Sequence, residues 1–94
     1  MLYIHLSYVR FEWDEAKNAK NQKKHGLAFE DAEYVFEGDV ITKRDPRYQS
    51  EERYLTVGRL DDVVVVIAHT PRGERTRIIS MRKANARERK KYQE

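Results

Sequence analysis

The feature that most restricts the fold is an unbroken apolar run, Val63-Val-Val-Val-Ile67-Ala68. A strand with one face in water would alternate apolar and polar residues, whereas this run predicts a central strand, over Val63–Thr70, that is covered on both faces. Strands are also expected at Arg53–Arg59 and Thr76–Arg82, and only short, turn-like segments separate the three. We therefore predict an antiparallel meander.

A polar helix is predicted before these strands. Asp14 is a suitable N-cap, and the helix should run to about Lys24 and end at Gly26 in a left-handed conformation. Its apolar face is thin and consists of Ala16 and Ala19. The helix should therefore pack lightly and present a basic surface.

The remaining segments complete an α+β domain. The apolar spacing of Phe29–Phe36 predicts an amphipathic helix with an acidic outer face. Short strands are expected at Val9–Trp13 and Val40–Lys43. Asn85 and Glu88 have the spacing of a capping box, which would begin a short C-terminal helix. The order β-α-α-β-β-β-β-α separates the helices from a largely antiparallel sheet, so residues 1–94 are interpreted as one α+β domain.

Composition excludes several kinds of site. The chain has no cysteine, which excludes disulfides, a cysteine nucleophile and thiolate metal ligands. The three histidines lack metal-ligand spacing and the four glycines are scattered, so neither a metal site nor a glycine-rich phosphate loop is predicted. No apolar run approaches the roughly 18 residues that span a bilayer. We expect a cytoplasmic protein with no metal, cofactor or membrane contact.

Charge is strongly segregated along the chain. The net charge is only +3, but residues 28–39 carry five acidic residues and no basic one. Residues 72–91 carry nine basic residues against two acidic ones. Asymmetry of this size indicates a partner of complementary charge. The plainer interpretation is a solvated helix surface, although the basic stretch spans a turn, a strand and a helix.

The arginines of this stretch suit phosphate. Arg72 is expected in a turn over Pro71–Glu74 and Arg82 at the end of the last strand, whereas Arg77 should lie on the opposite strand face because its spacing from Arg82 is odd. A guanidinium group binds phosphate with two parallel hydrogen bonds, so RNA or DNA is the natural partner. Two tyrosines near the polar loop over residues 44–51, Tyr48 and Tyr54, either stack on bases or simply pack.

Two further residues have alternative interpretations. His25, beside Lys24 at the end of the first helix, either transfers protons near neutral pH or only binds the last helical carbonyls. Glu88 either caps the C-terminal helix or, six residues after Arg82, orients that arginine or handles a proton. These roles of Glu88 are compatible.

Motifs throughout the chain resemble the BrnT family of toxins. The first half contributes Phe11-Glu-Trp-Asp14, Lys17, Asn21-Gln-Lys-Lys-His-Gly26, Phe29 and Ala32. The second half contributes Arg53, Val57-Gly58, Val66-Ile-Ala-His-Thr70, Arg72-Gly73, Arg77-Ile-Ile-Ser-Met-Arg82, Ala84 and Glu88. Met81 replaces a common alanine, which should alter packing only. Residues 1–8 precede the usual start of the family and form an N-terminal extension.

The resemblance implies a RelE-like fold, with helices packed on one face of a mostly antiparallel four- to five-stranded sheet. It also implies a type II toxin that cleaves RNA without a metal. The implied partner is a BrnA-like antitoxin that binds operator DNA as a dimer, which would allow a heterotetramer. The implied catalytic residues are His25, Arg72, Arg82 and Glu88. The implied residues for flanking phosphates are Lys24, Arg59, Arg77 and Lys83.

On this basis the predicted activity is metal-independent endoribonuclease cleavage by the neighbouring 2′-hydroxyl. Arg72 and Arg82 would bind the phosphate, and either His25 or Glu88 would transfer the proton. The alternative function is a non-catalytic nucleic-acid-binding or regulatory domain, which would use the same basic surface but needs no proton-transfer group. A third interpretation is a structural partner whose basic surface docks an acidic protein.

Overall fold

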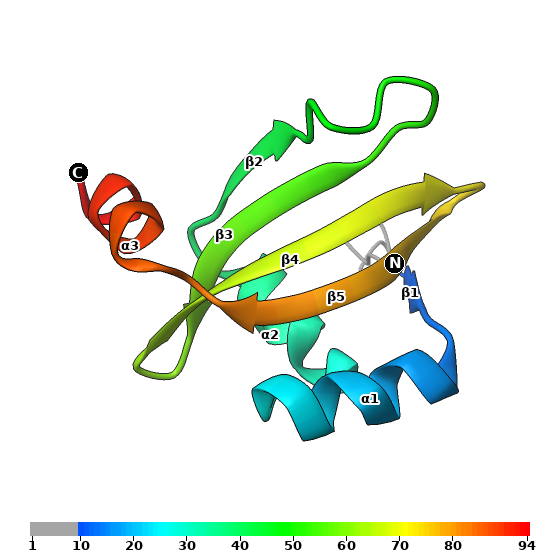
Figure 1. The fold of residues 1–94 in the computed structure, drawn as a ribbon, viewed down its shortest axis with the longest axis horizontal. Coiled ribbons are helices and arrows are strands. Elements are labelled where there is room, and N and C mark those ends of the chain that lie inside the picture. The colour runs from blue at the N-terminus through cyan, green and yellow to red at the C-terminus, as the bar shows by residue number, and fades with distance from the viewer. Residues whose placement is uncertain (1–9) are drawn as a thin grey trace, which may run out of the picture.

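A five-stranded mixed sheet forms the centre of the protein (Figure 1). The computed structural model describes residues 10–94. The strands lie in the order β1-β5-β4-β3-β2, and only the β1–β5 pair is parallel. The elements are β1 (Arg10–Glu12), α1 (Glu15–His25), η2 (Phe29–Asp31), α2 (Ala32–Glu37), β2 (Ile41–Arg44), β3 (Tyr54–Leu60), β4 (Val63–Arg72), β5 (Arg75–Lys83) and α3 (Ala86–Gln93).

The predicted order of elements and the meander β3-β4-β5 are confirmed. Among the described residues the first strand covers Arg10–Glu12, so it ends one residue before the predicted Trp13. The predicted extension over residues 1–8, and Val9 of the first strand, lie outside the described residues. None of the described helices is long and apolar enough to cross a membrane.

The central strand is covered on both faces, as its apolar run predicted. Val65 and Ile67 of β4 pack in a core with Phe29 and Val35 from the η2–α2 segment. Val64 and Val66 point to the other face, where Ala84 and Tyr92 of the C-terminal segment pack against them. Helices α1 and α2 therefore cover one face of the sheet, and α3 covers only one end of the other.

The predicted helix ends are also confirmed. The Asp14 carboxylate accepts hydrogen bonds from the backbone N–H groups of Ala16 and Lys17, and Gly26 is left-handed with φ 70°. Asn85 and Glu88 form the complete capping box of α3. These local signals succeed because each involves residues only a few positions apart.

Helix α1 docks through amide side chains, contrary to the predicted apolar face. Ala16 and Ala19 are exposed, whereas Asn18 and Asn21 are buried. The Asn18 side chain accepts from the Phe29 N–H (2.9 Å), and the Asn21 side chain donates to the Leu27 and Met81 carbonyls (both 2.9 Å) and accepts from the Met81 N–H (3.2 Å). The prediction failed because periodicity alone does not distinguish an exposed alanine from a hydrogen-bonded, buried asparagine.

A β-bulge in β5 reverses one prediction that matters for function. Ile78 and Met81 are both buried in the core beneath the helices, although regular alternation would place them on opposite faces. The register shifts here, since Ala68 pairs with Ser80 but His69 pairs with Ile78. Residue 79 is therefore the extra residue of a bulge.

As a result, Arg77 and Arg82 lie on the same face. Arg77 precedes the buried Ile78 and Arg82 follows the buried Met81, so both arginines point away from the helical layer. The prediction of opposite faces was wrong because it assumed unbroken alternation from residue 77 to residue 82. The bulge thus collects the arginines on the face that α3 only partly covers.

A chain of polar side chains crosses strands β2, β3 and β4, and its members in β3 and β4 are buried. The Thr42 and Thr56 hydroxyls are 2.7 Å apart, and the Thr56 hydroxyl is 2.7 Å from Nε2 of His69. His69 is 8% exposed, and its ring contacts Phe36 edge-on and stacks with Tyr54. Burial lowers the pKa of His69 to about 4, so the ring is neutral at physiological pH.

This burial makes folding stability depend on pH. The unfolded chain binds a proton on His69 below about pH 6.5, whereas the folded chain does so only near pH 4, so stability is complete above pH 6.5 and falls as the pH is lowered. We expect a loss of about 1–2 kcal/mol in the free energy of unfolding between about pH 7.5 and pH 5. Urea unfolding of the wild type and of His69→Asn measures it. An equal pH dependence in both proteins would contradict the assignment to His69.

Candidate active site

The face of the sheet opposite α1 and α2 carries a row of arginines at the β4–β5 pair, which we call the arginine track. Its members are Arg72, Arg75, Arg77 and Arg82. Arg75 lies two positions before Arg77 in β5 and therefore points to the same face. Arg72 pairs directly with Arg75 and shares that face too. Arg72 ends strand β4 and does not lie in a turn as predicted; the turn is made by Gly73, with φ 62°, and Glu74.

Arg72 and Arg82 lie at opposite ends of this track. Arg72 is opposite Arg75, and Arg82 follows seven positions later in β5. At about 3.3 Å per residue the two backbones are separated by roughly 20 Å. This separation is much longer than one phosphate group, so it favours contacts of the two arginines with different phosphates. Arg72 lies next to the turn between β4 and β5, whereas Arg82 lies near the other end of β5.

Arg82 is held in place by Glu88. Its two terminal nitrogens donate to the two carboxylate oxygens of Glu88 at 2.8 and 2.9 Å, the bidentate geometry in which guanidinium binds best. The same carboxylate accepts from the backbone N–H of Asn85 at 2.9 Å. Glu88 therefore has both of its predicted structural roles, since it caps α3 and orients Arg82.

This pairing keeps both groups ionised. Hydrogen bonds from Arg82 lower the pKa of Glu88 to about 2, and Glu88 raises the pKa of Arg82. Arg82 remains partly exposed, with 39% of its side chain accessible, so one side of the guanidinium still faces solvent. The pair is thus a fixed, partly open cation at the junction of β5 and α3.

A second arginine of the track has a similar partner. Arg77 donates to Glu12 of β1 at 2.8 Å, and Arg75 lies 3.9 Å from the same carboxylate. The parallel pairing of β1 with β5 places Glu12 opposite Arg77. Two carboxylates of this face are therefore occupied by arginines.

Sequence reasoning missed two cations close to the Arg82–Glu88 pair. Lys43 of β2 pairs with Leu55, which in turn pairs with Ala68, two positions after Val66, the partner of Arg82, so Lys43 lies on the face of Arg82. Its positive charge helps to lower the pKa of Glu88. Arg47 forms an ion pair with Asp45 at 2.8 Å, and its positive charge tends to lower the pKa of Arg82. The alternation in the predicted strand could have indicated that Lys43 shares a face with Ile41. No comparable pattern exists for Arg47, which lies in a loop.

The other predicted residues are distributed around this face. Arg59 of β3 pairs with Val64, whose side chain points to the same face as Val66, so Arg59 shares the face of Arg82. It lies next to the turn between β3 and β4. Lys83 pairs with Val65 and points to the helical side, and Lys24 is exposed on α1. The structure therefore does not bring Lys24 or Lys83 onto the arginine track.

Tyr48 and Tyr54 are both half-buried and contact other side chains of the protein. The Arg53 guanidinium lies 3.8 Å from the centre of the Tyr48 ring, and Tyr54 stacks on His69. The packing alternative is therefore the correct one for both residues. Tyr54 pairs with His69 and therefore lies on the helical side of the sheet, not on the face that carries Arg82.

His25 lies near the C-terminal end of β5, on the side of the sheet that α1 covers. Asn21 binds the backbone of Met81, the residue before Arg82, and the half-buried His25 follows Asn21 by one helical turn on the same side of α1. Helix α1 runs in the direction of β5, so its C-terminal end lies beneath the end of that strand (Figure 1). Among the hydrogen bonds within residues 10–94, none joins His25 to Arg82 or Glu88.

The arrangement offers fixed cations on one face of the sheet and His25 on the helical side, at the end of β5. Within the described part of the chain, no group of three histidine, aspartate or glutamate residues is placed to hold a metal ion. Chemically, the face can bind an extended polyanion along β5 and stabilise added negative charge at Arg82.

Comparison with known proteins identifies the family. No curated protein matches the chain. A family model does match, over residues 13–88, and it describes the ribonuclease toxin BrnT of type II toxin–antitoxin systems. The match covers most of the chain, from the end of β1 to the carboxylate that holds Arg82. The chain therefore belongs to the BrnT family of ribonuclease toxins.

Proposed function

We propose that this chain is a RelE-like, metal-independent endoribonuclease toxin that attacks RNA at the Arg82–Glu88 pair. The observation that carries the proposal is the bidentate, partly open Arg82 at one end of an arginine track, in a chain of a ribonuclease toxin family. A guanidinium that is already oriented loses little freedom on binding phosphate. The track supplies the extended positive surface that an RNA chain requires.

The proposed reaction uses the RNA's own 2′-hydroxyl. Its oxygen forms a bond to phosphorus, the bond from phosphorus to the 5′-oxygen breaks, and the products are a 2′,3′-cyclic phosphate and a free 5′-hydroxyl. The hydroxyl proton must leave, and the departing 5′-oxygen must gain one. Negative charge grows on the phosphoryl oxygens, where Arg82 would stabilise it, with Lys43 and Arg47 adding charge nearby.

We assign Glu88 to positioning and His25 to proton transfer. The carboxylate of Glu88 already binds Arg82 and Asn85, and a pKa of about 2 makes it a weak base at neutral pH. His25 lies at the same end of β5, and histidine is the side chain that most often serves as a general acid or base. Under this proposal Glu88 and His25 have different roles.

The remaining cations would bind flanking phosphates. Arg77 and Arg72 extend the track away from Arg82 along β5, and Arg59 lies on the same face across the sheet. Lys24 and Lys83 flank the end of β5 from the helical side and would contact RNA only at that edge. Arg72 is therefore reassigned from the cleaved phosphate to a distant one.

We further propose that a BrnA-like antitoxin neutralises the toxin. Type II systems pair a toxin with a protein antitoxin, and the chain belongs to such a family. An antitoxin that covers the arginine track would block RNA, and one that dimerises on operator DNA would form a heterotetramer with two toxins. Co-purification of the two proteins and measurement of the complex mass test this arrangement.

Cleavage in the presence of EDTA tests the catalytic proposal. We expect the purified protein to cleave single-stranded RNA in EDTA and to leave 2′,3′-cyclic phosphate or 3′-phosphate ends, because no step requires a metal. Gel analysis with end-group mapping measures both. Salt-dependent RNA binding without cleavage would instead support the non-catalytic alternative. Tight binding of an acidic protein with no RNA affinity would support the docking alternative.

A further inference from the structure

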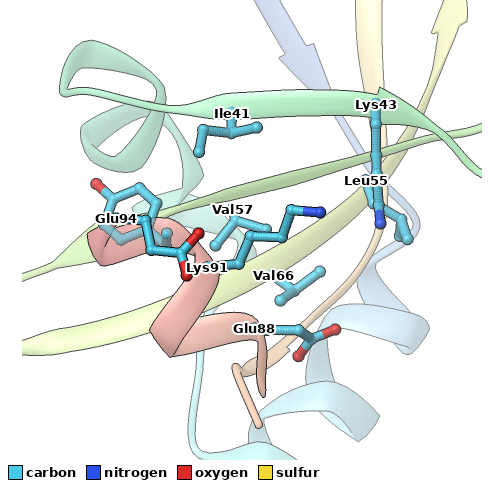
Figure 2. A pocket seen from close by; sticks show the side chains of 9 residues that line it. Ile41, Lys43, Leu55, Val57, Val66, Glu88, Lys91 and Glu94 are labelled. Atoms are coloured by element: carbon cyan, nitrogen blue, oxygen red, sulfur yellow. The ribbon is translucent and has the colours of Figure 1, made fainter. Parts of the chain in front are cut away.

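A groove opens on the functional face between α3 and strands β2, β3 and β4. Its volume is about 230 Å³, and its floor is apolar, formed by Leu55, Val57 and Val66 (Figure 2). Ile41, 49% exposed, forms one wall. Neighbouring strands pair Ile41 with Val57 and Val57 with Val66, so the floor and wall form one continuous apolar row.

Hydrogen bonds hold the groove open at both ends of α3. Near its end, the Tyr92 hydroxyl donates to the Asp39 carbonyl at 2.7 Å, and near its start Glu88 binds Arg82. Helix α3 has no buried residue of its own, so these contacts, together with Ala84 and the Tyr92 ring, position it. The cavity therefore exists in the free protein.

The groove adjoins the proposed active site. Glu88 lines the groove and also binds both terminal nitrogens of Arg82. Lys91 extends from α3 over the apolar floor, and Lys43 descends from β2 on the opposite side (Figure 2). A ligand in the groove would therefore meet an apolar surface below, the ammonium groups of Lys43 and Lys91 and the Glu94 carboxylate at the rim, and the oriented arginine beside it.

We propose that this groove binds one nucleobase of the RNA substrate, next to the phosphate at Arg82. The inference rests on the proposed ribonuclease function and adds a subsite to it. A nucleotide combines a flat base, whose π-face packs on apolar surfaces, with a negatively charged phosphate, which matches an apolar floor beside cations. The Tyr92 ring in the lining offers the aromatic surface on which bases of any sequence pack.

Size and charge favour a base over a segment of a protein partner. Pockets for drug-sized ligands measure about 300–1,000 Å³, so a groove of this volume suits a smaller group. The rim ammonium groups of Lys43 and Lys91 call for negative charge immediately outside the apolar part. Phosphates provide that charge on both sides of every base.

Binding of two non-cleavable oligomers tests the subsite. One is a short single-stranded oligonucleotide with 2′-deoxy sugars, which lacks the nucleophile, and the other has the same backbone without bases. Wild type should bind the base-bearing oligomer about 5- to 100-fold more tightly. Val57→Phe, which fills the groove from its floor, should remove this preference and keep the affinity for the abasic oligomer. Fluorescence anisotropy measures both affinities, and thermal melting shows that the variant is folded.

Two further variants separate the subsite from general electrostatics. Ile41→Lys changes an exposed position of an edge strand and should also remove the base preference, whereas a purely electrostatic surface would bind both oligomers more tightly. Arg82→Ala should weaken binding of both oligomers alike, because it removes a phosphate contact.

Several results would overturn the inference. Equal wild-type affinity for the two oligomers, or an unchanged base preference in Val57→Phe, would show that no base enters the groove. An unchanged preference together with weaker antitoxin binding would assign the groove to the protein partner. If wild type bound neither oligomer, the proposed RNA function itself would fail, whereas base-independent binding would leave that function intact.

Discussion

Replacing Arg82 by alanine is expected to slow RNA cleavage by about 100- to 1,000-fold, the usual effect of removing one preorganised charge from a site where negative charge develops. Arg82→Lys should recover little of this loss, because one ammonium group cannot form two parallel hydrogen bonds to Glu88 and still offer further oriented N–H groups to a phosphate. Single-turnover rates on a defined RNA measure the effect, and growth arrest in cells should be lost in parallel.

Arg87→Ala provides the matched control. Arg87 carries the same charge in the first turn of α3, is exposed, and makes no hydrogen bond or ion pair among residues 10–94. Its removal should change the cleavage rate only slightly. Thermal melting should show that Arg82→Ala is folded, because Asn85 and Glu88 still cap the helix. Full cleavage and full toxicity of Arg82→Ala would contradict its assignment to the phosphate.

Replacing His25 by alanine is expected to slow cleavage by about 100- to 10,000-fold, the range typical for loss of a general acid or base. Glu88→Gln should have a smaller effect, since glutamine can still cap α3 and accept a hydrogen bond from Arg82. A positioning residue tolerates this isosteric change, whereas a general base does not. Comparing the two variants therefore distinguishes the proton-transfer group from the residue that orients Arg82.

A modified substrate sharpens this comparison. Sulfur in place of the scissile 5′-oxygen departs without protonation, so His25→Ala should cleave this RNA nearly as fast as the wild type if His25 is the acid. Slow cleavage of both substrates would leave His25 the role of base. If His25→Ala were fully active and Glu88→Gln inactive on ordinary RNA, the two roles proposed here would be reversed.

Much of the fold was predictable from local patterns. The apolar run at Val63–Ala68 predicted a central strand covered on both faces, and the core on both sides of β4 confirms it. Asp14, Gly26 and the Asn85–Glu88 box marked helix ends correctly. The docking of α1 was not predictable in this way, because Asn21 acts through the backbone of Met81, 60 residues away.

The sequence by itself determined which elements form, where the helices begin and end, and that the C-terminal half carries a dense positive charge. These properties depend on residues within a few positions of each other. Only the tertiary structure decided which cations act together. The bulge at residue 79 turned Arg77 to the face of Arg82, strand length moved Arg72 to the far end, and packing brought Lys43 and Arg47 near. Strand register sets these neighbours, and it depends on pairing between segments that local sequence patterns do not connect.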